Sequence, residues 1–153
     1  MSIIDKLADM YTDVDNTYAA NAARARAKGY NRKEADYEKK RKLNDQAYFL
    51  FMFTRIEDRI RKSSERVFSR KSDKLTNYKN QRAWDMIRNR GNRDHLDLLE
   101  RVSFLTLYNG SDYQIMVGYK RLRDNIAHGE EVDEIDMTAV INNMTRFYRD
   151  LNN

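Results

Sequence analysis

The fold class of this chain is decided by its last amphipathic stretch, residues 137–151, which reads MTAVINNMTRFYRDL. Apolar residues recur there at steps of three and four, a spacing that places them in one stripe along an α-helix. The same spacing returns in residues 115–126 and on one face of residues 49–67. The stripe consists of Met137, Val140, Ile141, Met144, Phe147, Tyr148 and Leu151. These patterns predict an all-α protein.

The composition agrees with long helices. The 153 residues include no Pro and only five Gly, whereas sandwiches, barrels and propellers usually need many more turn residues. A chain of this length suits one domain. We therefore expect a single helical domain over residues 1–153, built as an up-and-down bundle of five to six helices. Residues 1–42 are expected to form an N-terminal helical extension.

Single residues mark the expected helix boundaries, because Gly can end a helix and Asn, Ser or Asp can cap its start. The expected helix ends are Gly29, Gly91 and Gly129, with a turn at residues 109–111. The expected N-caps are Asn31 (in a capping box with Glu34), Ser72, Asn92, and either Asp133 or Asp136.

The second expected helix is apolar on two faces. Besides its main stripe it carries Tyr48, Phe51 and Met52, which point elsewhere. Such a helix is either buried all round or packed against another subunit. The fourth expected helix, residues 96–107, is apolar on most sides, so we expect it to be central.

Several classes of protein are excluded. The chain has no Cys, which removes disulfides, thiolate zinc sites and cysteine nucleophiles. Residues 1–13 lack the pattern of a signal peptide. The longest apolar run, residues 47–53, is far too short to span a membrane. We expect a soluble cytoplasmic protein with no membrane partner.

The charge is unevenly distributed. Residues 1–101 carry 24 Lys and Arg against 16 Asp and Glu, a net charge of +8, whereas the whole chain carries +5. The stretch 24–42 holds nine Lys and Arg against three acids, with Tyr30 and Tyr37 between them. Such a stretch either follows the phosphates of RNA or is a solvated helix face.

The two histidines differ in their setting. His95 follows charged residues at the start of an expected helix, so we interpret it as a surface residue. His128 closes the stretch Arg123–His128, RDNIAH, directly before Gly129. In a continued helix His128 would lie ~140° from Arg123, since five residues rotate by ~500°. If the helix ends at Gly129, the backbone can turn there and a polar cluster becomes feasible.

Two interpretations of this cluster remain open. A helix C-terminus favours a protonated imidazole, whereas a nearby Arg123 disfavours it, and the balance can suit His128 to acid–base work. Alternatively, His128 only caps carbonyl groups and Arg123 pairs with an acidic neighbour. The neighbours in question are Asp124, Glu130 and Glu131.

The amino-acid sequence of Arg123–His128 resembles the signature of the HEPN superfamily of small helical-bundle proteins. In that signature an Arg is followed after four to six residues by His, and often directly by Asn, Asp or His. The position is also similar, because the segment closes the penultimate helix before a final amphipathic one. The resemblance covers the helical layout of residues 43–151.

The resemblance implies a metal-independent endoribonuclease without a cofactor, acting as a homodimer whose two Arg/His motifs share one cleft. Arg123 would bind the scissile phosphate. His128 would act as general base or acid in attack by the RNA 2′-hydroxyl. Asp124 would orient this pair, with Asn125 assisting. Glu57 is a further acidic candidate, for which a surface salt bridge is the alternative.

The resemblance also bears on partners. It implies RNA as substrate and a toxin or phage-defence role, with a neutralising antitoxin or a larger defence complex as possible partners. Where one branch has a Tyr two residues after the His, this chain has Glu130, so the nucleotidyltransferase antitoxin of that branch is not expected. The alternative is a noncatalytic RNA-binding or protein-interaction module. The RNA-binding candidates are Lys39, Lys40, Arg41, Lys42, Lys120 and Arg121.

Overall fold

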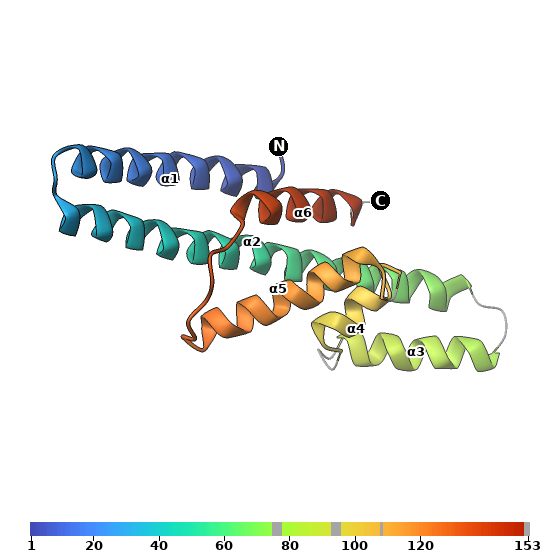
Figure 1. Ribbon diagram of the computed structural model, residues 1–153. Coiled ribbons are helices and arrows are strands. Elements are labelled where there is room, and N and C mark those ends of the chain that lie inside the picture. The colour runs from blue at the N-terminus through green and yellow to red at the C-terminus, as the bar shows by residue number, and fades with distance from the viewer. Residues whose placement is uncertain (75–77, 93–95, 108, 152–153) are drawn as a thin grey trace. The chain divides into compact units, whose positions relative to one another are not determined.

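The computed structural model describes residues 1–74, 78–92, 96–107 and 109–151, and this part of the chain is helical without strands (Figure 1). This confirms the predicted all-α class and the predicted number of helices. The elements are α1 (Ile3–Ala27), α2 (Asn31–Lys74), α3 (Tyr78–Asn92), α4 (Leu98–Ser103), α5 (Ser111–Ala127) and α6 (Met137–Asp150).

The helices are grouped into two compact units. Unit 1 comprises Met1–Arg55 and Leu122–Arg146, and unit 2 comprises Ile56–Arg121 and Phe147–Asn153. The division is not sequential, because α2, α5 and α6 each contribute residues to both units.

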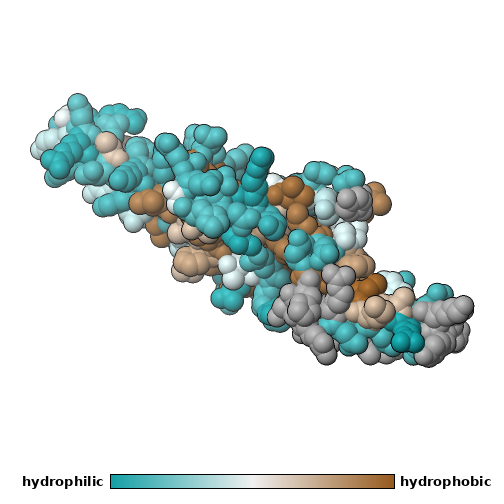
Figure 2. Space-filling view, turned by 90° about the horizontal axis from the view of Figure 1, so that it is seen from below, coloured by the Kyte–Doolittle hydropathy of each residue, from teal (hydrophilic) through white to brown (hydrophobic). Residues whose placement is uncertain are grey.

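Unit 1 is built on an antiparallel hairpin of α1 and the first half of α2 (Figure 1). Gly29 makes the turn with φ +68°, a conformation that Gly adopts at little cost. Along the hairpin, Arg41 donates from Nε and Nη2 to the two carboxylate oxygens of Asp15, at 2.8 and 3.0 Å. The Tyr11 hydroxyl donates to Asp45 at 2.9 Å. At the turn, this end of the unit is largely hydrophilic (Figure 2).

The core of unit 1 draws on α1 as well as α2. Ile4 on α1 is fully buried, and Ala22 and Ala25 on the same helix are also buried. The segment expected to be an extension therefore supplies core residues to the unit in which it lies. The core residues from the other elements of unit 1 are Tyr48, Phe49, Met52, Phe53, Met137, Val140 and Met144.

The residues on the second apolar face of α2 differ in how far they are exposed to solvent. Tyr48 and Met52 are buried within the chain. Of the two alternatives, these residues therefore follow the first, burial within the chain, and do not contact another subunit. Phe51 is 56% exposed and packs edge-to-face on Tyr48, with the ring centroids 5.9 Å apart.

Unit 2 holds a second apolar core with a buried cation. The Arg101 guanidinium, 4% exposed, donates to the Ser64 hydroxyl at 3.1 Å and to the Leu96 carbonyl at 3.3 Å. Phe104 packs edge-to-face on Phe68 at 5.0 Å between ring centroids. The buried apolar residues of unit 2 are Ile56, Ile60, Phe68, Leu96, Val102, Met116 and Phe147.

The fourth helix was predicted wrongly. It is six residues long and ends at Ser103, and Leu107, expected to belong to it, lies beyond the helix and is 81% exposed. Its N-cap is Asp97 rather than Asn92, because Asp97 and Glu100 form a capping box, with each side chain accepting from the other's backbone N–H. Residue 92 instead ends α3.

The other boundaries are partly as predicted. The helix ends at Gly29 and Gly129 are confirmed by φ values of +68° and +71°. Asp136 caps α6, since its carboxylate accepts from Ala139 N–H at 2.9 Å. Ser72 is not an N-cap, because α2 continues through it to Lys74. The box of Asn31 and Glu34 is also wrong, since α2 already begins at Asn31 and Glu34 instead pairs with Arg26 at 2.6 Å.

None of the helices in the described ranges combines the length and the apolar character that crossing a membrane requires.

The carboxylate of Asp45 gives a test of the packing between α1 and α2. Burial raises its pKa, and the charges of Asp15 and Glu134 add to the rise. A raised pKa means that the protonated form favours the fold, so this contribution is present at acid pH and lost as pH rises through the folded-state pKa. Asp45→Asn cannot ionise and keeps an acceptor for the Tyr11 hydroxyl.

We therefore expect Asp45→Asn to raise the melting temperature at pH 7. The free energy of unfolding should rise by less than ~1 kcal/mol, because the site is partly solvated. The gain should disappear below about pH 3, where the parent carboxyl is protonated. Exposed Asp9→Asn on α1 is the control. A lower melting temperature for Asp45→Asn at pH 7 would show that the hydrogen bond from Tyr11 to the ionised group dominates.

Candidate functional site at the end of α5

The C-terminal turn of α5 is fixed by backbone hydrogen bonds. Gly129 N–H donates to the Ile126 carbonyl at 3.1 Å, and Glu130 N–H donates to the Asn125 carbonyl at 3.0 Å. This paired arrangement is the usual way in which a left-handed Gly closes a helix. His128 N–H still donates to Asp124 in the helical manner, at 3.0 Å. His128 therefore stands at the last helical hydrogen bond, where the backbone begins to turn.

Arg123 lies one and a half turns before this end and is held on two sides. Its guanidinium carbon is 5.7 Å from the centroid of the Phe53 ring, a cation–π distance. Its Nη1 is 2.8 Å from the Asp124 carboxylate. The side chains of Arg123 and Asp124 are each 34% exposed. Since Phe53 is fully buried, the guanidinium is held at a fixed part of the apolar core of unit 1.

The ion pair with Asp124 answers part of the question left open by the sequence. One of the three acidic neighbours considered, Asp124, does pair with Arg123. A carboxylate at 2.8 Å neutralises part of the cation in the resting protein. The same contact also limits the directions in which the planar guanidinium can turn, so it is compatible with an orienting role for Asp124.

His128 is solvent-exposed in the turn that follows α5. Within the described residues its imidazole makes no hydrogen bond or ion pair, and only its backbone N–H is bonded, to the Asp124 carbonyl. It therefore does not cap carbonyl groups through its side chain. An exposed imidazole at a helix C-terminus is accessible to a ligand.

The remaining site candidates, the assisting Asn125 and the acidic Glu57, lie in different parts of the chain. Asn125 precedes the helix end on α5 and is half-buried, in unit 1 with Arg123 and His128. Glu57 is half-buried on α2 and belongs to unit 2. The interpretation of His95 as a surface residue lies outside the described residues.

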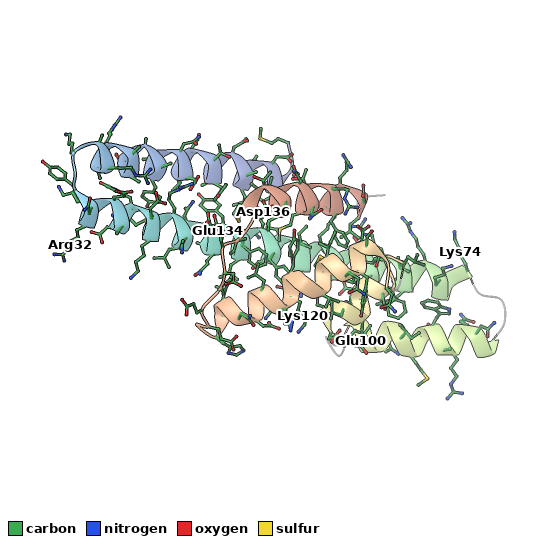
Figure 3. The ribbon with its side chains drawn as sticks, viewed as in Figure 1. Arg32, Lys74, Glu100, Lys120, Glu134 and Asp136 are labelled. Atoms are coloured by element: carbon green, nitrogen blue, oxygen red, sulfur yellow. The ribbon has the colours of Figure 1, made fainter. Side chains whose placement is uncertain are left out.

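The basic candidates on the hairpin are not equivalent. Lys39, Lys40 and Lys42 are exposed, but Arg41 is held by Asp15 and by Glu38, the latter at 3.3 Å. These carboxylates hold the pKa of Arg41 above its usual value, mainly through the hydrogen bond to Asp15. Arg41, whose side chain is 35% exposed, therefore already holds a structural ion pair within the hairpin. The two remaining candidates, Lys120 and Arg121, lie on α5 in unit 2 (Lys120 in Figure 3).

Two aromatic–cation pairs near the hairpin turn were not recognised in the sequence. Lys33 Nζ lies 5.3 Å from the centroid of the Tyr30 ring, and Lys40 Nζ lies 5.2 Å from that of Tyr37. Both pairs have a spacing of three residues, which brings side chains together on a helix surface. That spacing was a usable signal. Arg32 extends from the same end of unit 1 (Figure 3).

The described residues contain no group of three or more His, Asp or Glu side chains arranged to hold a metal ion. Comparison with protein-family models, with curated proteins and with solved structures finds no match to this chain.

Proposed function

We propose that this protein is an endoribonuclease of the HEPN type that cleaves RNA without a metal ion, with Arg123 and His128 at its active site. The single observation that carries the proposal is the arrangement at the end of α5. There a guanidinium fixed on Phe53 is followed, at the end of the same helix, by an exposed imidazole. A phosphate-binding group and a titratable group are thus presented by one rigid element.

The chemistry follows from these two side chains. The RNA 2′-hydroxyl attacks the adjacent phosphorus and His128 takes its proton. The bond from phosphorus to the 5′-oxygen of the next nucleotide breaks, and that oxygen takes a proton from solvent water. The products carry a 2′,3′-cyclic phosphate and a free 5′-hydroxyl. The planar guanidinium of Arg123 is suited to the charge that develops on the phosphate oxygens. DNA lacks the attacking hydroxyl and is not expected to be cleaved.

The proposal is tested directly by incubating the purified protein with total RNA in EDTA. Cleavage that persists in the chelator and leaves 2′,3′-cyclic phosphate ends supports it. An absence of cleavage with the parent protein over a wide range of protein concentration contradicts it. Cleavage that stops in EDTA would point to a different, metal-dependent chemistry.

A homodimer is expected with this function. One chain supplies a single Arg123 and a single His128, and two-fold pairing would bring two sets to one cleft. The exposed ring of Phe51 is an apolar feature of α2 that a second copy could cover. Sedimentation should show a dimer whose dissociation lowers activity. Full activity from a monomer at every concentration would contradict the expectation.

Binding to RNA is expected to depend steeply on salt through Lys39, Lys40 and Lys42. Reversing these three charges to Glu should flatten the plot of log affinity against log salt by about two units, since each phosphate contact on a single strand contributes ~0.7. Arg41 is left in place so that its pairing with Asp15 survives. Reversal at exposed Lys6 on α1 is the control. An unchanged slope would identify the stretch as a solvated face.

The second candidate is a noncatalytic RNA-binding or protein-interaction module. The observation that favours RNA binding is the pair of tyrosine rings covered by lysines near the hairpin turn, because aromatic rings beside cations suit the bases and phosphates of a single strand. This candidate predicts salt-dependent binding without cleavage. A toxin or phage-defence role, with a neutralising partner in the cytoplasm, accompanies the first candidate.

A further inference from the structure

Unit 2 contains a hollow that the proposed active site does not use. Its cavity measures about 240 Å³, below the ~300–1,000 Å³ of pockets that enclose drug-sized ligands. The hollow therefore suits one planar ring better than a complete cofactor. Its apolar lining comes from α2, from the residues after α4 and from the C-terminal end of the chain. This lining consists of Val67, Phe104, Leu105 and Leu151.

Two arginines, Arg66 and Arg70, border this hollow. They stand four residues apart on α2, so their side chains leave the same face of the helix, ~6 Å apart along its axis. Arg66 donates from Nε to the Lys62 carbonyl at 3.4 Å. Among the described side chains, no carboxylate forms an ion pair with Arg66 or Arg70.

The acidic groups nearby are already engaged with other cations. Asp150, which also borders the hollow, has Arg149 Nε at 3.4 Å. Glu65 has Nη1 of the buried Arg101 at 3.8 Å. As far as the described side chains go, the positive charge of Arg66 and Arg70 is therefore available to a ligand. A planar guanidinium favours a phosphate or carboxylate.

A second, shallower hollow shares both arginines. It is lined by Lys62, Glu65, Arg66, Ser69 and Arg70, all on α2. Exposed Lys74 stands one helical turn beyond Arg70 and continues the basic line (Figure 3). The two hollows together present an apolar recess of the size of one ring beside a row of cationic side chains. This arrangement suits a polymer that carries rings and anionic groups at regular intervals.

We propose that unit 2 binds single-stranded RNA at these hollows, with one base in the apolar recess and the backbone phosphates on Arg66 and Arg70. The inference relies on the proposed function in naming RNA as the strand. A base placed against Val67 and Phe104 gains apolar contact irrespective of its identity, as is usual for sequence-tolerant single-strand sites. The guanidinium groups and the Ser69 hydroxyl are donors for the phosphates that flank it.

The probe for the test is a fluorescein-labelled hexa-adenylate, used with a His128→Ala protein so that binding is measured without cleavage. Arg66→Gln combined with Arg70→Gln should weaken binding roughly tenfold per arginine and flatten the salt slope by about 1.4. The matched control is Lys71→Gln with Arg82→Gln, which removes the same charge at exposed positions of unit 2 outside both hollows.

The base is tested separately from the phosphates. Trp84 is the single tryptophan of the chain, and its ring centroid lies 6.3 Å from that of Phe104. Its fluorescence should therefore respond to hexa-adenylate and not to an abasic strand with the same phosphates. Val67→Phe fills the recess and keeps both arginines, so it should weaken hexa-adenylate binding by about 5- to 150-fold, the range for one lost base contact, with an unchanged salt slope.

Several results would overturn the inference. One is an equal loss of binding in the control double variant, and another is an unchanged Trp84 signal. Binding of adenosine monophosphate as tight as that of the strand would indicate a free-nucleotide pocket instead. Displacement of the strand by decanoate would indicate an acyl site. Cleavage activity is not a readout here, so loss of the proposed active site and loss of this binding site are distinguishable.

Discussion

His128→Ala is expected to lower the rate of RNA cleavage by ~10²–10⁴-fold, the contribution of a single acid–base group, while RNA binding is largely retained. The fold should survive, because the side chain is exposed and the turn is held by backbone bonds around Gly129. Single-turnover cleavage in EDTA measures the rate, and circular dichroism checks the helix content. Glu131→Gln, exposed in the same loop, is the control and should cleave like the parent.

Arg123→Ala should differ from His128→Ala in kind. It removes the proposed phosphate contact, so affinity and rate should fall together. It also removes the guanidinium from the Phe53 ring and from Asp124, so some stability is lost as well. Arg123→Lys keeps the charge without the planar fork and separates these effects. Combining the Ala variants should cost much less than the product of the single losses, since groups acting as a unit are not additive.

Undiminished cleavage by the His128→Ala protein would show that the nuclease proposal is wrong. Undiminished cleavage by the Arg123→Ala protein, with His128 still required, would show that Arg123 does not bind the phosphate and that other residues do.

Phe53→Ala is expected to destabilise the protein by ~3–5 kcal/mol, the range for truncating a buried Phe. The ring is fully buried and stacks on Phe49, with the centroids 5.8 Å apart. The matched control is Phe51→Ala, the same substitution two residues earlier on α2, where the ring is 56% exposed. Its cost should stay within about 1 kcal/mol. Chemical denaturation at several protein concentrations measures both.

The control carries information of its own. A cost for Phe51→Ala that approaches that of Phe53→Ala, and that grows with protein concentration, would place Phe51 in a subunit interface. A small cost for Phe53→Ala would contradict the core position given to it. Phe53→Leu keeps much of the apolar volume but has no ring face, so it should remove the cation–π contact with Arg123, worth ~0.5–2 kcal/mol.

The fold class could be predicted because helical periodicity is a local property. The stripe of α6, and the glycines that close α1 and α5, act over a few residues and were recognised correctly. Ser72 misled because a residue that can cap a helix also occurs inside helices, where propagation of the backbone bonds outweighs the cap. Asn92 misled because it ends α3 and does not begin the next helix. Asp97 and Glu100 carried a complete capping-box signal, and it was overlooked rather than absent.

In the candidate site, contacts between neighbours in the sequence could be predicted, whereas contacts between residues far apart in the sequence could not. Asp124 was foreseeable as a neighbour of Arg123, because it is the next residue. The Phe53 ring, 70 positions away from Arg123 in the sequence, comes under the guanidinium only through tertiary packing. Likewise, Arg41 looks like one cation among several until the hairpin brings Asp15 to it. Periodicity shows which face is apolar, but not which side chain from another helix will meet it.

The way in which the two units share helices decides how the protein can be divided experimentally. The chain passes between them within α2, α5 and α6, so each transition lies in a hydrogen-bonded helix rather than in a flexible linker of the kind that separates ordinary domains. A stop codon after Arg55 would remove the α5 and α6 segments from unit 1, and a start at Ile56 would leave them attached to unit 2 without their neighbours. Neither unit corresponds to a contiguous stretch of gene. The smallest contiguous piece that contains all of unit 1 is residues 1–146, and the smallest that contains all of unit 2 is residues 56–153, which also carries part of unit 1.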